Sequence, residues 1–141
     1  MDPATAQSHS GAPLILIVEG DLDTRVLYRE YLRHAGFCTA DAHDGHQALA
    51  TVRELRPDAV LTEFALPGTD GFEFCRAVKA SVSTRHIPVL AVTGRLEYLD
   101  APDRFTQAGI AQVLVTPCSL RVIAEELQRL RPGAVATSVR F

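Results

Sequence analysis

Short apolar segments rich in β-branched residues alternate along this chain with segments of helical periodicity, and this alternation limits the fold more than any other feature. The apolar segments are Leu14–Val18, Phe37–Ala40, Ala59–Thr62, Pro88–Val92 and Gln112–Val115. Several are almost wholly apolar, which is typical of parallel strands covered by helices on both faces. Five strands alternating with five helices predict a doubly wound α/β sheet, whose functional residues follow the carboxyl ends of the strands. At these ends the chain carries Glu19, Glu63, Thr93 and Thr116.

The helical segments carry their own boundary signals. Apolar residues recur at helical spacing within 27–35, 48–55 and 120–130, and a shorter pattern lies within 72–78. Gly36 is placed to end the first helix, Ser119 to cap the last, and Asp44 and Asp70, each followed by glycine, indicate turns or helix starts. Because proline is tolerated only in a first turn, Pro102 predicts that the fourth helix starts near residues 100–102 and has about two turns.

Composition and charge favour one cytoplasmic domain that binds neither nucleic acid nor membrane. The chain has 141 residues, 47% of them hydrophobic, and a formal net charge of −3, so there is no basic excess to neutralise phosphates. The longest apolar run, Leu14–Val18, is too short to span a bilayer. Cys38, Cys75 and Cys118 lie far apart without a Cys-x-x-Cys pair, which favours reduced thiols over disulfides or a zinc site.

The two ends of the chain differ from the segment between them. Residues 1–12 are rich in Ser, Ala, Thr and Gly without an apolar period, and we expect a disordered lead-in there. Residues 13–131 form the expected domain. Residues 132–141 begin with a helix-stopping Pro-Gly pair and are interpreted as a tail or the start of a linker.

Four sequence blocks, in order along the chain, resemble the receiver domain of bacterial response regulators. They are LILIVEGD (Leu14 to Asp21), PDAVLTEFALPGTDGF (Pro57 to Phe72), IPVLAVTG (Ile87 to Gly94) and the segment from Gly109 to Pro117. The resemblance covers about residues 12–130. It implies the flavodoxin-like receiver fold, a five-stranded parallel sheet in the order 2-1-3-4-5, and a role in two-component or phosphorelay signalling.

The resemblance also implies a phosphorylation site, and this chain departs from most of its pattern. In the family an acidic pair holds Mg²⁺, an aspartate accepts phosphate from a histidine kinase, and a Thr or Ser and a Lys bind the phosphoryl oxygens. The acidic pair aligns with Glu19 and Gly20, the acceptor with Glu63, the lysine with Thr116, and a switch aromatic with Val113. The positions that match are Thr93, the small Gly94 and Pro117, with Asp21 retained beside the acidic pair, where it would cap the first helix.

These departures predict a receiver that does not accept phosphate. Acyl phosphate formation needs an accurately placed carboxylate, and Glu63 is one methylene longer than aspartate. Mg²⁺ needs near-octahedral oxygen ligands, and Gly20 removes one carboxylate, while Thr116 brings no charge to the transferring oxygens. We therefore expect no tight Mg²⁺ binding, no other metal or cofactor, and no enzyme activity.

Alternatives stay open for the site and for the domain. Glu63 is a fixed charge that mimics a phosphorylated state, or the result of drift in an unused pocket, or a residual acceptor. Arg95 either swings over the pocket as its cation or lies on the surface. The alternatives to a phosphorylation-independent protein-binding module are a receiver still phosphorylated on Glu63 with Mg²⁺, and a doubly wound domain that binds a small ligand.

Two further expectations follow from the resemblance. The Thr116-Pro117 peptide bond is expected to be cis. The face made by the fourth helix, fifth strand and fifth helix is expected to bind a protein partner or a second copy of the chain. Because Val113 is short and stiff, we expect the switch by a rotating aromatic ring to be lost on that face.

Overall fold

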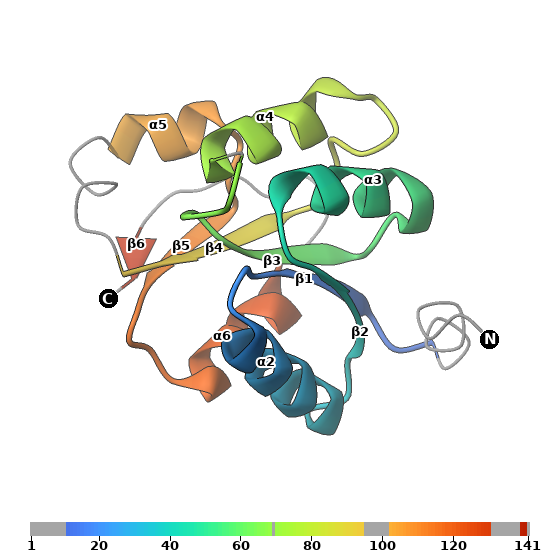
Figure 1. Ribbon diagram of the computed structural model, residues 1–141, viewed down its shortest axis with the longest axis vertical. Helices are drawn as coiled ribbons and strands as arrows, with labels where there is room; N and C mark the ends of the chain where they lie inside the picture. The colour runs from blue at the N-terminus through green and yellow to red at the C-terminus, as the bar shows by residue number, and fades with distance from the viewer. Residues whose placement is uncertain (1–10, 69, 95–101, 131–138, 141) are drawn as a thin grey trace.

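Strands and helices alternate along the whole described part of the chain (Figure 1). The computed structural model describes residues 11–68, 70–94, 102–130 and 139–140. The elements are β1 Leu14–Val18, α2 Leu22–His34, β2 Cys38–Ala42, α3 Gly45–Leu55, β3 Ala59–Glu63, α4 Gly71–Ala80, β4 Val89–Thr93, α5 Pro102–Gln107, β5 Gln112–Val115, α6 Leu120–Arg129 and β6 Val139–Arg140. The five predicted strands are all present, and their ends shift by at most two residues.

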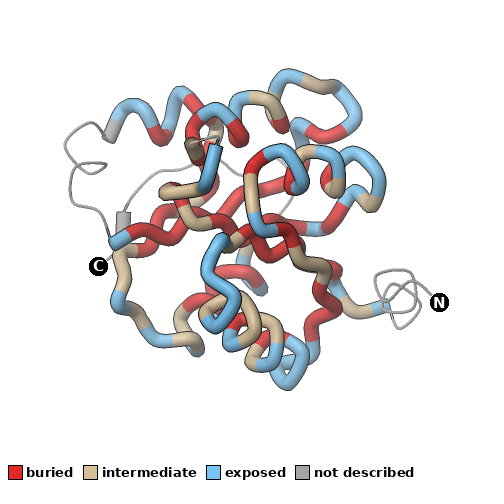
Figure 2. Tube along the Cα trace, viewed as in Figure 1, coloured by how far each residue is buried: buried red, intermediate tan, exposed pale blue. Residues whose placement is uncertain are grey.

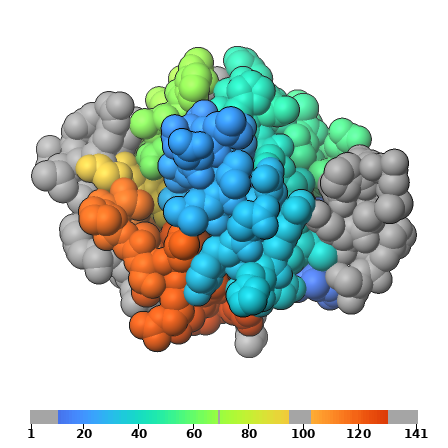
Figure 3. Space-filling view, turned by 60° about the horizontal axis from the view of Figure 1, so that its bottom comes forward, coloured from blue at the N-terminus to red at the C-terminus, as the bar shows by residue number. Residues whose placement is uncertain are grey.

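The strands form one parallel sheet in the order β2-β1-β3-β4-β5-β6. β1 pairs on one side with β2, where Leu14 lies beside Cys38, and on the other with β3, where Ile15 lies beside Ala59. Helices α3, α4 and α5 cover one face of the sheet, and α2 and α6 cover the other (Figure 1). Figure 3 shows α2 and α6 side by side on that second face. The first five strands confirm the predicted order 2-1-3-4-5.

A short strand, β6, lies within the segment that the sequence predicts as a tail or linker, residues 132–141. Its residues Val139 and Arg140 pair in parallel with Val113 and Leu114 of β5. The edge of a sheet presents a row of unpaired backbone N–H and C=O groups, so a short segment can add there without an apolar pattern of its own. The remaining residues of that segment, 132–138 and 141, lie outside the described residues, as do residue 131 and residues 1–10 of the expected lead-in.

Two apolar layers fill the space between the sheet and its helices. Because successive residues of a strand point to opposite faces, Leu16 and Val18 of β1 pack toward α3 and α4, while Ile15 and Ile17 pack against α2 and α6. All five residues of β1 are buried, as expected for a strand covered on both faces. Figure 2 shows the buried strands between helices whose outer sides are exposed.

Local side chains set the helix boundaries. Asp21, Asp44, Asp70 and Ser119 each accept a backbone N–H in the first turn of α2, α3, α4 and α6, which confirms the predicted helix starts. Pro102 is the first residue of α5, which is only 6 residues long, as its position predicted. Within the described ranges, no helix is long and apolar enough to cross a membrane.

Candidate functional site

The carboxyl ends of four neighbouring strands bring the predicted site residues to one edge of the sheet. Glu19 follows β1, Glu63 ends β3, Thr93 ends β4 and Thr116 follows β5. The strand register holds these ends level, because Glu63 lies beside Val92 of β4. This edge is where doubly wound sheets bind their ligands, so the residues that the sequence analysis grouped do come together.

The first loop uses its acidic side chains to build the start of α2. Glu19 Oε2 accepts a hydrogen bond from the main-chain N–H of Asp21 at 3.0 Å. The main-chain O of Glu19 accepts a hydrogen bond from Arg25 Nη1 at 2.7 Å. Asp21 Oδ2 accepts Thr24 N at 2.9 Å and Thr24 Oγ1 at 2.7 Å. The hydrogen bond from the Thr24 side chain is the main cause of a lowered pKa of Asp21, and the one from the Thr24 main chain lowers it further. Asp21 is therefore the N-cap of α2.

Gly20, where the family has its second carboxylate, lies close to the loop that follows β3. A Cβ at Gly20 would lie 3.2 Å from Pro67 Cδ and 3.5 Å from the main-chain O of His43. Any side chain at this position would require Pro67 to shift by a few tenths of an ångström. The missing carboxylate therefore coincides with a close approach between two loops.

The Glu63 carboxylate binds the main chain that follows it. Its Oε1 accepts the N–H of Phe64 at 2.8 Å and the N–H of Ala65 at 3.1 Å. The side chain is half-buried, and the main-chain O of Glu63 accepts Thr62 Oγ1 at 3.0 Å.

The loops after β4 and β5 are held together by Thr93 and Thr116. Thr93 is buried, and its main-chain O accepts the Thr116 N–H at 2.9 Å. A Cβ at Gly94 would lie 2.9 Å from Thr116 Oγ1, so even an alanine there would require a shift of one of the two residues. The Thr116-Pro117 peptide bond is cis, which confirms the prediction. Arg95, the candidate cation of the pocket, lies outside the described residues.

The carboxylates at this edge do not fit a Mg²⁺ ion. Asp21 Oδ2 is used to cap α2, Glu63 Oε1 already accepts two backbone N–H groups, and Gly20 brings no side-chain oxygen. Mg²⁺ requires several oxygen ligands in near-octahedral geometry. Across the ranges that the structure describes, no three His, Cys, Asp or Glu side chains are grouped so as to hold a metal ion.

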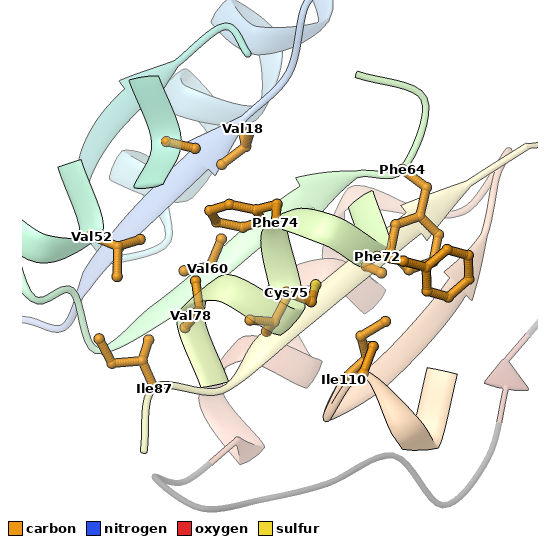
Figure 4. Close-up of a cluster of buried hydrophobic side chains, with 14 of the residues drawn as sticks. Val18, Val52, Val60, Phe64, Phe72, Phe74, Cys75, Val78, Ile87 and Ile110 are labelled. Atoms are coloured by element: carbon orange, nitrogen blue, oxygen red, sulfur yellow. The ribbon is translucent and has the colours of Figure 1, made fainter. Parts of the chain in front are cut away.

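An aromatic cluster next to the acceptor position was missed from the sequence. The Phe64 ring stacks on Phe72 of α4 at 4.7 Å between centroids and on Phe105 of α5 at 5.2 Å. Figure 4 shows the rings of Phe64 and Phe72 against each other. Arg104 Cζ lies 4.1 Å from the centre of the Phe72 ring. Since these residues come from three separate segments, no short motif contains the cluster.

Val113, which the resemblance aligns with the switch aromatic, is fully buried in the layer under α4 and α5. A valine there is a packing residue with one preferred rotamer in most settings.

Tyr28 of α2 lies near the carboxylates of the site, and burial raises its pKa well above the ordinary value. The charges of Glu19, Cys118 and Glu63 add to this shift. The phenol of Tyr28 therefore stays protonated near these carboxylates at neutral pH.

Comparisons with known proteins agree with the fold. Residues 15–128 match the family model of the response regulator receiver domain. The chemotaxis protein CheY of Pseudomonas aeruginosa is 33% identical over 117 residues, which cover 82% of this chain and 94% of that protein. The DNA-binding response regulator MtrA of Mycobacterium leprae is 40% identical over 86 residues, 61% of this chain. The chain spans only 37% of the length of that relative.

Solved structures show the same fold over most of this chain. The chemotaxis response regulator CheY4 of Vibrio cholerae superposes with a TM-score of 0.76 at 27% identity, covering 84% of this chain and 98% of that chain. The receiver domain of the sensor histidine kinase PA1611 of Pseudomonas aeruginosa, which has a magnesium ion coordinated in its active site cleft, gives a TM-score of 0.76 at 28% identity. It covers 84% of this chain and 96% of that chain. With the family model matched over residues 15–128, this chain belongs to the response regulator receiver domain family of two-component signalling.

Proposed function

We propose that this receiver domain signals by binding a protein partner and does not accept phosphate. The proposal rests above all on the Glu63 carboxylate, whose Oε1 accepts the N–H groups of Phe64 and Ala65 at 2.8 and 3.1 Å. Phosphoryl transfer to a carboxylate requires an oxygen aimed in line at the phosphorus atom. Oε1, held by two N–H groups of its own loop, is a poor nucleophile in both direction and electron density.

Two further positions support the proposal. Phosphoryl transfer depends on positioned cations at the transferring oxygens. Thr116 brings a neutral hydroxyl where the family has a lysine, and Gly20 brings no carboxylate to hold Mg²⁺. All three changes act against the same transition state, so restoring one of them is not expected to restore the reaction.

The partner surface that we propose is the face formed by α5, β5 and α6. Asp103, Arg104, Thr106 and Gln107 of α5 are exposed, and they offer polar groups of both charges. β6 lies at the open edge of β5, so a partner on this face would meet α5 and the chain's own last strand. Arg121 of α6 instead lines the groove between α6 and α2, which makes α5 the better part of this face to test.

We further propose that the domain works in the cytoplasm, without nucleic acid and without enzyme activity of its own. Cys38, Cys75 and Cys118 are all present as thiols, which supports a reducing compartment. The net charge of −3 supports a protein partner over a nucleic acid.

The test is phosphorylation by a small molecule. The protein is incubated with Mg²⁺ and acetyl phosphate and its intact mass is measured, with an active receiver of the same family treated in parallel. We expect no gain of a phosphoryl group by this protein, and none by Glu63→Asp, since Gly20 and Thr116 are unchanged in that variant. A labile adduct mapped to Glu63 of the unchanged protein would overturn the proposal.

A further inference from the structure

We propose that Glu63 is a positioning residue for α5: its carboxylate fixes Phe64, and the Phe64 ring holds α5 in place through Phe105. The inference rests on the proposed function and deepens it, because α5 belongs to the face that we assign to a partner. Glu63, at the position of the family's phosphate acceptor, would then have a structural role of its own. This role does not require the switch aromatic, whose position Val113 takes in this chain.

The first step is the main chain of Phe64. Its N–H is donated to Glu63 Oε1 at 2.8 Å, and the next N–H, of Ala65, is donated to the same oxygen at 3.1 Å. On the other side, the Phe64 main-chain O accepts the N–H of Leu66 and of Gly71, both at 3.0 Å. Hydrogen bonds to a charged acceptor are about twice as strong as neutral ones. The carboxylate therefore contributes strongly to the fixed conformation of this loop.

The second step is the Phe64 ring, which has no room to move. It has 0% exposure, and it stacks on Phe72 with an interplanar angle of 28°. A Cβ at Gly71 would lie 1.8 Å from Phe64 Cδ1, so the ring packs directly against the main chain at the start of α4. A change in the Phe64 main chain must consequently displace its ring, its neighbours, or both.

The third step is α5. Phe105 is 1% exposed, and its ring lies 5.2 Å from that of Phe64 with an interplanar angle of 23°. The neighbouring Arg104 reaches over Phe72, which links the same helix to α4. A helix of 6 residues is far below the length that is stable alone in water, so its position depends on such anchors. The aromatic cluster is therefore the route from Glu63 to the partner face.

The test measures amide hydrogen exchange at the end of α5 in the isolated, unmodified chain. The N–H groups of Ala108 and Ile110 are donated to Arg104 O at 2.9 Å and Phe105 O at 3.1 Å, and they report how firmly α5 is held. In Glu63→Ala we expect exchange about tenfold faster at these amides, since a hydrogen bond to a charged group contributes on the order of a factor of ten or more. Glu63→Gln, which keeps a weaker acceptor, should give a smaller increase. Amides within β1 should keep their protection.

Two controls separate this coupling from a loss of overall stability. Glu73→Ala removes an exposed carboxylate from α4 and should leave exchange in α5 unchanged. Phe105→Leu should speed exchange in α5, and adding Glu63→Ala to it should then have little further effect, because both changes break the same connection. The inference is wrong if the amides of α5 keep their protection in both Glu63→Ala and Glu63→Gln. It is also wrong if the rate increases of Glu63→Ala and Phe105→Leu multiply fully in the double variant. Because the experiment uses neither phosphate nor a partner, its failure would leave the proposed function standing.

Discussion

Replacement of Gly71 by alanine is expected to destabilise this protein, although the same change normally strengthens a helix. Gly71 is the first residue of α4, and its N–H is donated to Phe64 O at 3.0 Å. A Cβ at this position would lie 1.8 Å from Phe64 Cδ1, 2.7 Å from Phe64 Cε1 and 2.9 Å from Phe64 Cα. Since one of these atoms belongs to the main chain, a rotation of the ring alone cannot relieve the clash.

The magnitude follows from two opposing effects. Alanine is favoured over glycine within a helix by about 1 kcal/mol. Forcing extra atoms into a close-packed region costs about 1–3 kcal/mol, and the upper end applies here because Phe64 is stacked against both Phe72 and Phe105. We expect a net loss of about 2 kcal/mol in the free energy of unfolding. For a domain of this size that corresponds to a decrease in Tm of about 8 °C.

Urea and thermal unfolding followed by circular dichroism measure this change. Gly20→Ala is the matched control, because its Cβ would approach the side chain of the exposed Pro67 at 3.2 Å and would lie at the ordinary contact distance of 3.5 Å from the main-chain O of His43, so a small loss is expected. Phe64→Ala removes the two ring contacts and leaves the one with Cα at 2.9 Å, so Gly71→Ala should cost less in that background but should still destabilise. If Gly71→Ala is as stable as the unchanged protein, the packing argument for this loop is wrong.

Three further predictions concern acid stability, thiol reactivity and the partner face. The hydrogen bond from the first turn of α3 lowers the pKa of Asp44 in the folded protein. The Asp44 carboxylate therefore stabilises the fold above the pKa of the unfolded chain, and this stabilisation is lost as pH falls through the lower pKa of the folded protein. In urea unfolding, the stability of Asp44→Asn should depend less on pH below about pH 4 than that of the unchanged protein. Burial raises the pKa of Cys75 to about 12, so a thiol reagent followed by mass spectrometry should modify the partly exposed Cys118 first and Cys75 only upon unfolding. If a second copy of the chain is the partner, Gln107→Arg on α5 should weaken self-association in sedimentation experiments, and Ala50→Arg on the exposed side of α3 should not.

The strands and helix starts could be predicted because their signals are local. A strand buried on both faces, such as Leu14–Val18, has to be apolar at successive positions, and this pattern is visible without knowledge of its neighbours. Asp44 and Asp70 cap helices through N–H groups three residues further on, so the contact lies within one turn of chain. The meeting of Glu19, Glu63 and Thr93 at one edge then follows from parallel strands alone.

The resemblance indicates which positions of the phosphorylation site differ in this chain, and the structure shows the contacts of the side chain at one of them. From the sequence, phosphate mimicry and drift explain Glu63 about equally well, and residual acceptance explains it less well. The direction of its carboxylate depends on rotamers and on the path of the following loop, and neither is encoded in a short pattern. The hydrogen bonds to Phe64 and Ala65 make this carboxylate a part of the loop's own structure.

The contacts that the sequence could not predict join segments far apart along the chain. The rings of Phe64, Phe72 and Phe105 meet only because β3, α4 and α5 pack on one face of the sheet, and each ring taken separately looks like an ordinary core residue. Gly20 appears in the sequence only as a missing carboxylate, whereas in the fold it approaches Pro67 closely. The periodicity of apolar residues indicates which residues are buried, because burial repeats with the period of the strand or helix. It does not indicate which distant side chain a buried residue contacts, because that contact depends on how whole strands and helices pack together.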